Sequence, residues 1–197
     1  LEWIRPLGDS TLTTIGAWRH YESSSAYDGD FTAYDAVIGT QDEELDQYSL
    51  EARINSPGGQ TWDYQAGLYA YYSELDSLGL ITMSQALVRN MGLILFFPNG
   101  TANVDENLHT TTSFAAFGQL TWNITDRFTV TLGLRYTREK KERRGSQVTT
   151  PGSLLDIPPV AGPDIFYNAN RTDNDVSPTL NLRYFPGDDL MLYASVS

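Results

Sequence analysis

The side chains that could perform catalysis or bind a metal are few in this sequence, and their spacing supports neither. The chain has two histidines and no cysteine. His20 and His109 lie far apart, and neither has the spacing of neighbouring ligands that a zinc site needs. His20 stands near Glu22 and Ser23, but no third group orients it as a nucleophilic triad requires. We therefore expect no enzyme, no metal site and no cofactor.

Charge narrows the class of partner. The formal net charge is −12 at pH 7 and the pI is about 4.4, so the chain lacks the basic face that nucleic-acid binding needs. Asp28–Gly29–Asp30 offers oxygen ligands that calcium accepts, but the spacing of a full EF-hand loop is missing. A solvated acidic loop is the favoured interpretation of this segment.

Hydrophobic patterning excludes a transmembrane helix. The sequence holds no run of 18 or more apolar residues, and its longest apolar patch, 91–97, is too short and contains a glycine. The chain opens on Leu1 with no charged-then-apolar leader. We expect the N-terminus of the protein to lie outside this sequence.

The dominant pattern is the alternation of apolar and polar residues that predicts half-buried strands. It is clearest at 127–137, where the apolar set alternates with threonine, glycine and arginine: Phe128, Val130, Leu132, Leu134 and Tyr136. The same alternation occurs at 48–54, 61–72 and 114–122. Further strands are predicted at 10–22, 179–185 and 189–197, although the faces of 10–22 cannot be assigned.

The length of the strands and the alternation of short and long connections distinguish a membrane barrel from a soluble β-sandwich. The predicted strands run for about 10–15 residues, against about 9–11 for a tilted membrane strand and 5–6 for soluble strands. Tight turns at 6–9, 56–60, 123–126 and 186–189 alternate with long connections at 23–43, 75–110 and 144–173. This parity predicts an antiparallel transmembrane β-barrel with short periplasmic turns and long extracellular loops.

Aromatic residues near the strand ends predict two bands at the membrane interfaces. Some of these aromatic residues stand next to the tight turns, and others stand eight to ten residues further along the same apolar faces. In tilted strands this separation is roughly 20–25 Å along the membrane normal. The predicted lipid-interface aromatics are Trp62, Tyr72, Phe114, Trp122, Phe128 and Tyr136.

The strand count predicts a part of a wall. The sequence predicts seven strands and a short stub at 1–5, so about seven to eight strands in all. A sheet of this size that does not close would leave open edges, which are not viable in lipid. We expect 1–197 to be part of a single outer-membrane β-barrel domain, with a plug domain and the C-terminal strands outside this sequence.

Three segments resemble the barrel of TonB-dependent receptors: LEARINSPGGQTWDYQAGLYAYYSE at 50–74, FAAFGQLTWNITDRFTVTLGLRYTREKKE at 114–142, and VSPTLNLRYFPGDDLMLYASVS at 176–197. The resemblance implies a barrel of roughly 22 strands with a plugged lumen in the bacterial outer membrane. It also implies energy-coupled import of a scarce nutrient, with TonB contacted through N-terminal regions absent here. A ferric siderophore is the first choice of ligand, and cobalamin or an oligosaccharide stays open, as does a passive porin.

Ligand contacts are expected in the long loops and polar contacts in the lumen. Tyr27, Tyr34, Phe96 and Phe97 are the candidate ligand contacts, although a hydrophobic clasp within its own loop is the favoured interpretation of Phe96 and Phe97. If the apolar faces meet lipid, the lumen-facing polar residues are Glu51, Arg53, Arg135 and Arg183.

Two further features stand at the predicted outer side. A short helix is predicted at about 83–91, with the capping-box spacing of Thr82 and Gln85 at its start and Gly92 at its end. The basic run at 138–144 fits either contact with lipopolysaccharide phosphate or solvation, and solvation is slightly favoured.

Overall fold

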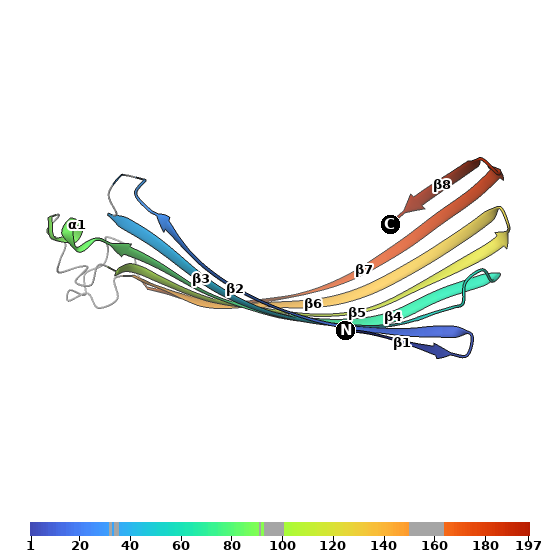
Figure 1. Ribbon diagram of the computed structural model, residues 1–197, viewed down its shortest axis with the longest axis horizontal. Coiled ribbons are helices and arrows are strands. Elements are labelled where there is room, and N and C mark those ends of the chain that lie inside the picture. The colour runs from blue at the N-terminus through green and yellow to red at the C-terminus, as the bar shows by residue number, and fades with distance from the viewer. Residues whose placement is uncertain (32, 34–35, 91, 93–100, 150–163) are drawn as a thin grey trace.

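The chain forms one antiparallel sheet in which every strand pairs with the next along the sequence. The computed structural model describes residues 1–31, 33, 36–90, 92, 101–149 and 164–197. Its strands are β1 (Glu2–Leu7), β2 (Ser10–Asp28), β3 (Val37–Asn55), β4 (Trp62–Met83), β5 (Thr101–Thr125), β6 (Phe128–Thr149), β7 (Ile165–Gly187) and β8 (Leu190–Val196). The sheet order is β1 to β8 without a crossover (Figure 1). The all-β antiparallel expectation is confirmed.

The alternation of short and long connections is also confirmed. Figure 1 shows a long curved sheet with the tight turns gathered at one end and the helix at the other. The tight turns fall at 8–9, 56–61, 126–127 and 188–189, and the longer connections at 29–36, 84–100 and 150–164. We name these ends the short-turn rim and the long-connection rim.

The predicted extents of strands and loops were wrong. The six central strands run for 19 to 25 residues, so much of 23–43, 75–110 and 144–173 is strand. Twenty-two residues at a tilt of about 40° span roughly 55 Å, about twice the height of a lipid-facing band. Beyond that band apolar and polar residues are no longer sorted by face, as Leu75 and Leu78 on opposite faces of β4 show. The alternation therefore disappears from the sequence while the backbone pairing continues. Glu22, for example, still pairs with Glu44, and Glu44 with Asp76.

The predicted helix exists, but its cap was assigned to the wrong residue. Helix α1 (Gln85–Asn90) begins after Ser84, whose Oγ accepts a hydrogen bond from the Leu87 amide at 3.2 Å. Thr82 belongs to β4, and its Oγ1 donates to the carbonyl oxygen of Ile38. Gly92, with φ of 70°, follows the helix as expected. In the described ranges no helix is long and apolar enough to cross a membrane.

The turn between β3 and β4 is organised by one carboxylate. Asp63 accepts hydrogen bonds from the Gly59 amide at 3.0 Å and from the Gln60 amide at 3.3 Å. Gly58 and Gly59 have φ of 84° and 73°, which L side chains rarely adopt. Asn123 Nδ2 also donates to Asp63 Oδ2 at 3.1 Å, which joins this turn to the end of β5.

Candidate functional site

The register divides the sheet into two chemically different faces. Residues directly opposite each other in an antiparallel pair share a face. One row across the sheet is Trp62, Trp122, Val130 and Leu182, and its neighbour on the other face is Asp63, Thr121, Thr131 and Asn181. We call the first the apolar face and the second the polar face. The alternation expected for 48–54, 61–72, 114–122 and 127–137 is what the register shows.

The apolar face has no partner within the described chain. Leu68 is 65% exposed and Phe114 is 59% exposed, whereas the buried apolar side chains in the described part are Val88 and Ala115. Exposed apolar surface of this extent marks a contact with protein or membrane. Together with the long strands and the alternating connections, a sheet that is apolar on one face and polar on the other fits the wall of a barrel in lipid.

Aromatic rings form a band on the apolar face near the short-turn rim. The rings of Trp62 and Trp122 stack with centroids 4.9 Å apart and an interplanar angle of 11°. The Phe128 and Tyr184 rings meet edge to face at 6.3 Å. Tyr184 is an addition that the sequence analysis missed, since 179–185 was predicted as a strand without an aromatic role for it.

A second aromatic band crosses the apolar face about ten residues further along the strands. Tyr72 lies beside Tyr48, with ring centroids 6.5 Å apart, and Tyr48 pairs with Trp18 in the register. Phe114 and Tyr136 lie on the same face within one or two rows. The six predicted interface aromatics therefore occupy one face, at the two heights where interfacial girdles stand. Their contact with lipid stays a prediction.

The four predicted lumen residues all lie on the polar face. Arg53 Nη1 bonds to Glu51 Oε1 at 3.1 Å. Arg135 donates to Thr137 Oγ1 at 3.1 Å and lies over the rings of Tyr69 and Phe117, with its Cζ 5.8 and 6.0 Å from their centroids. Each of these groups thus has a partner within the wall.

Arg183 is held in the same way. Its Nη2 donates to Thr129 Oγ1 at 3.3 Å, and its Cζ lies 5.5 Å from the centroid of the Phe185 ring. Arginine stacked on an aromatic ring keeps most of its five N–H donors for other acceptors. That these four residues face a lumen or a plug stays a prediction.

Near the long-connection rim the polar face carries a cluster that the sequence analysis missed. Asn107 Oδ1 accepts from Arg143 Nη2 at 2.9 Å and also from the hydroxyl of Tyr167. Arg143 Nη2 lies 3.1 Å from the Tyr167 oxygen, and Asn107 Nδ2 donates to Asp105 Oδ1 at 2.8 Å. The sequence signal for Arg143 was the alternation of faces within the basic run 138–144. Odd positions of this run, which include Arg143, lie on the polar face, and even positions lie on the apolar face.

A small cavity of about 160 Å³ adjoins this cluster. Tyr27, Asn103, Asp105 and Asn107 line it together with Gln41 and Ser77. Tyr27 reaches it across Gly39, where a Cβ would lie 2.1 Å from the tyrosine ring. The Oδ1 atom of Asn103 is screened from solvent and has no hydrogen-bond partner among the described residues. The cavity is therefore lined by a phenol, amides, a hydroxyl and a carboxylate on the polar face.

The other predicted ligand contacts cannot be compared with the structure. Tyr34, Phe96 and Phe97 lie outside the described residues. Asp28 and Asp30 organise their own turn, because Asp28 Oδ1 accepts from the Asp30 and Phe31 amides at 3.0 and 3.1 Å and Asp30 Oδ2 accepts from the Val37 amide at 2.7 Å. This bonding fits the favoured interpretation of a solvated acidic turn.

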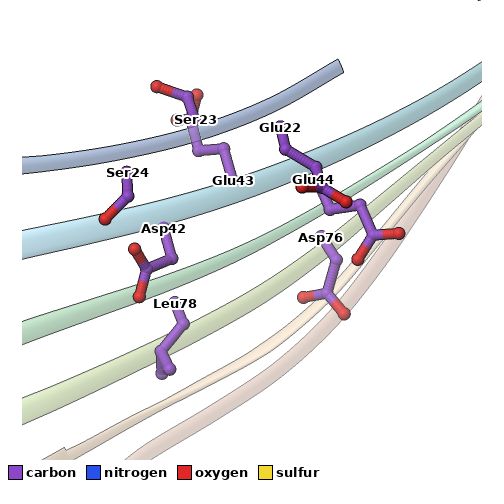
Figure 2. A pocket seen from close by; sticks show the side chains of 8 residues that line it. All are labelled: Glu22, Ser23, Ser24, Asp42, Glu43, Glu44, Asp76 and Leu78. Carbon is purple, nitrogen blue, oxygen red and sulfur yellow. The ribbon is translucent and has the colours of Figure 1, made fainter. Parts of the chain in front are cut away.

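Carboxylates gather between the outer aromatic band and the long-connection rim. A hollow of about 550 Å³ crosses three strands here. Figure 2 shows its lining side chains, among them Glu22 on β2, Asp42 and Glu44 on β3, and Asp76 on β4. Glu22, Glu44 and Asp76 are paired in the register, which places like charges opposite each other. This arrangement concentrates negative potential on the apolar-face side of the rim.

His20 lies beside this hollow and is bonded at both ring nitrogens. Nε2 is 3.1 Å from Glu22 Oε1, and Nδ1 is 3.2 Å from Asp46 Oδ1. The hydrogen bonds to Glu22 and then Asp46 raise the pKa of His20 above its usual value, against a smaller opposing effect of desolvation. Ligand atoms of His20, Glu22 and Glu44 lie within 4.8 Å of one another, but all three are exposed and both nitrogens have carboxylate partners. We assign neither a metal nor a triad to them.

Comparison with known proteins agrees with the wall geometry. The family model described as the β-barrel of TonB dependent receptor-like proteins matches residues 1–197. The chain therefore belongs to the TonB-dependent receptor β-barrel family, whose members are outer-membrane proteins of Gram-negative bacteria. No curated protein sequence matches it significantly.

Solved structures share its fold, among them two bacterial receptors. The ferric yersiniabactin uptake receptor FyuA from Yersinia pestis is 20% identical with a TM-score of 0.76, and the match covers 96% of this chain and 26% of that one. The siderophore receptor PiuA from Acinetobacter baumannii is 10% identical with a TM-score of 0.62, covering 98% of this chain and 30% of that one. The chain thus spans less than a third of either receptor, and the expected barrel fold is confirmed over that part.

Proposed function

We propose that this chain forms part of the barrel wall of an outer-membrane receptor that imports a ferric siderophore by TonB-coupled transport. The family match over residues 1–197 is the observation that carries the proposal. The ferric yersiniabactin and siderophore receptors that share its fold support this choice of ligand over cobalamin or an oligosaccharide. Family and structural neighbours are transport receptors, which argues against an enzyme.

In this proposal each face of the sheet contacts a different environment. The apolar face with its two aromatic bands meets membrane lipid, and the polar face with Glu51, Arg53, Arg135 and Arg183 lines the interior. We assign residues 1–197 to one barrel domain. The plug, the segment that contacts TonB and the closing strands belong to parts of the protein outside this chain.

The ligand vestibule is the polar face near the long-connection rim. Arg143 is fixed by Asn107 and Tyr167, and a guanidinium held in this way offers its remaining N–H groups to an anionic oxygen ligand. Tyr27, an expected ligand contact, lines the neighbouring cavity with Asn103 and Asn107. Aromatic rings with convergent polar groups are typical of small-molecule sites.

Uptake of radioiron-labelled ferric siderophore tests the proposal. We expect a strain lacking the full-length protein to lose uptake under iron limitation, and the plasmid-borne protein to restore it only when TonB and the proton gradient are intact. Uptake that persists without TonB would indicate passive diffusion, as through a porin. Restored transport of cobalamin or an oligosaccharide with no siderophore uptake would contradict the choice of ligand.

A further inference from the structure

The apolar face carries a groove that crosses β3, β4, β5 and β6. It has a volume of about 490 Å³. Large and small side chains alternate along two register rows, Leu50–Ala70–Phe114 and Ala52–Leu68–Ala116–Tyr136. The alanines form the low floor between the larger side chains. An apolar furrow of this kind fits a single hydrocarbon chain better than a flat wall does.

Arg138 closes the groove at its outer end. It is part of the lining and lies opposite Phe114 on β5 and Asn174 on β7. Over the part of the chain that the structure describes, the guanidinium of Arg138 makes no hydrogen bond or ion pair, whereas Lys140 bonds to Glu142 at 2.9 Å and Lys141 to Glu139 at 2.8 Å. An exposed, unpaired guanidinium beside an apolar furrow is suited to phosphate, which it can bind with two parallel hydrogen bonds.

The height of Arg138 matches the head-group level. It lies one row beyond Tyr136, and the next row contains Tyr72 and Lys140. Tyr136 donates from its hydroxyl to Asn174 Oδ1 at 2.9 Å, so the polar tip of this ring points toward the Arg138 row. Aromatic residues with polar tips stand where hydrocarbon meets head groups.

The distribution of charge on the apolar face favours an anionic head group beside β6 over one beside β2, β3 and β4. Above the aromatic band, β2, β3 and β4 carry Glu22, Asp46 and Glu74 on the same face. On that face β6 carries three cations and one carboxylate, namely Arg138, Lys140 with its ion-pair partner Glu142, and Arg144. A phosphate is repelled by the first group and attracted by the second. The groove and the cationic side of the rim therefore coincide.

We propose that this groove binds lipid A of the outer leaflet, with an acyl chain between Leu68 and Phe114 and a phosphate on Arg138. The proposal rests on the outer-membrane placement given above, which sets the long-connection rim and Arg138 in the outer leaflet. Lipid A joins several acyl chains to phosphates at the membrane surface, which is the combination that the groove and Arg138 present.

The test measures lipid bound to the full-length protein purified from outer membranes. Wild type, R138Q, R138K and A116L are exchanged into lipid-free detergent and titrated with lipid A or with phosphatidylglycerol, and bound lipid is counted by native mass spectrometry. We expect R138Q to weaken lipid A binding about tenfold, the size of one charge-assisted contact. A116L should also weaken it, because the larger side chain fills the part of the groove that the acyl chain would occupy. R138K should retain part of the binding. Heat-modifiable migration on a gel confirms that each variant is folded.

R144Q is the matched control, because Arg144 lies on the same face of β6 but far from the groove. Unchanged lipid A binding by R138Q, or equal loss in R144Q, would overturn the site. An equal loss of phosphatidylglycerol in R138Q would overturn the assignment to lipid A. Siderophore uptake by the same variants keeps the two proposals apart: it should not change in R138Q, and its absence in wild type would contradict the transport proposal alone.

Discussion

The guanidinium carbon of Arg143 lies 4.9 Å from the centroid of the Tyr167 ring, and the same arginine bonds Asn107 on the strand at its other side. Strands β5, β6 and β7 are thereby joined on the polar face. Gly145 allows this, because a Cβ at that position would lie 2.5 Å from the Tyr167 hydroxyl. The contact fixes a cation near the long-connection rim, where we place the ligand vestibule.

Replacing Arg143 with glutamine should weaken siderophore binding. Removing a charged donor from a polar site typically costs about 1.5–3 kcal/mol, which corresponds to a loss of roughly tenfold or more in affinity. R144Q is the control, since its side chain lies on the opposite face. Fluorescence quenching by the ferric siderophore measures both variants. Equal affinities for R143Q and R144Q would remove Arg143 from the vestibule.

Replacing Gly67 with valine should destabilise the wall. A Cβ at Gly67 would lie 2.5 Å from Phe117 Cζ and 2.9 Å from the carbonyl oxygen of Ala52, and overpacking of this kind costs about 1–3 kcal/mol. G118A is the matched control, because the nearest atom to a Cβ there is 3.8 Å away. Urea unfolding in lipid vesicles, followed by tryptophan fluorescence, should show a lower midpoint for G67V alone. An unchanged midpoint would show that the Phe117 ring and the backbone give way at little cost.

The stacked pair Trp62 and Trp122 should contribute to stability as a pair. Aromatic pairs contribute about 0.5–1.5 kcal/mol beyond the area that they bury. We expect W62A and W122A to lower the free energy of unfolding, and the double variant to lower it by less than the sum of the two. The double-mutant cycle is measured in vesicles by the same urea unfolding. Strict additivity would mean that the rings act only through separate contacts with lipid.

The pKa values of the two histidines should be shifted in opposite directions from the usual value. Hydrogen bonds to Glu22 and Asp46 raise the pKa of His20, whereas desolvation and then Arg143 lower the pKa of His109. Both lie beyond the outer aromatic band. NMR titration of the imidazole protons should show His20 gaining its proton at higher pH than His109. A common midpoint for both rings would contradict the bonding described here.

The stability of the folded protein should decrease with rising pH as His20 loses its proton. Its folded pKa is above the unfolded one, so its contribution is fully present below the unfolded pKa and is lost as pH rises through the folded pKa. The double variant E22Q/D46N removes both partners and should abolish this dependence. The thermal midpoint of wild type and variant, measured on either side of neutrality, checks it. Identical pH profiles would show that the His20 contacts contribute nothing measurable.

The sequence by itself determined the two faces of the wall and the two aromatic bands. A strand between lipid and a polar interior must alternate, so Phe128, Leu132 and Tyr136 could be assigned to one face without coordinates. Turn-forming residues at 56–60 and 186–189 likewise marked the short-turn rim. These features are local, and each is imposed by the immediate surroundings of a few consecutive residues.

The tertiary structure decided what lies beyond the membrane-height band and which distant residues meet. Outside that band no lipid selects one face for apolar residues, so the sequence loses its alternation, although backbone pairing carries the strands on to the long-connection rim. The face of 10–22 was fixed only by pairing Trp18 with Tyr48. Asn107, Arg143 and Tyr167 are joined by a register that runs through three strands. Register depends on hydrogen bonds between segments far apart in the chain, and no short stretch of sequence contains that information.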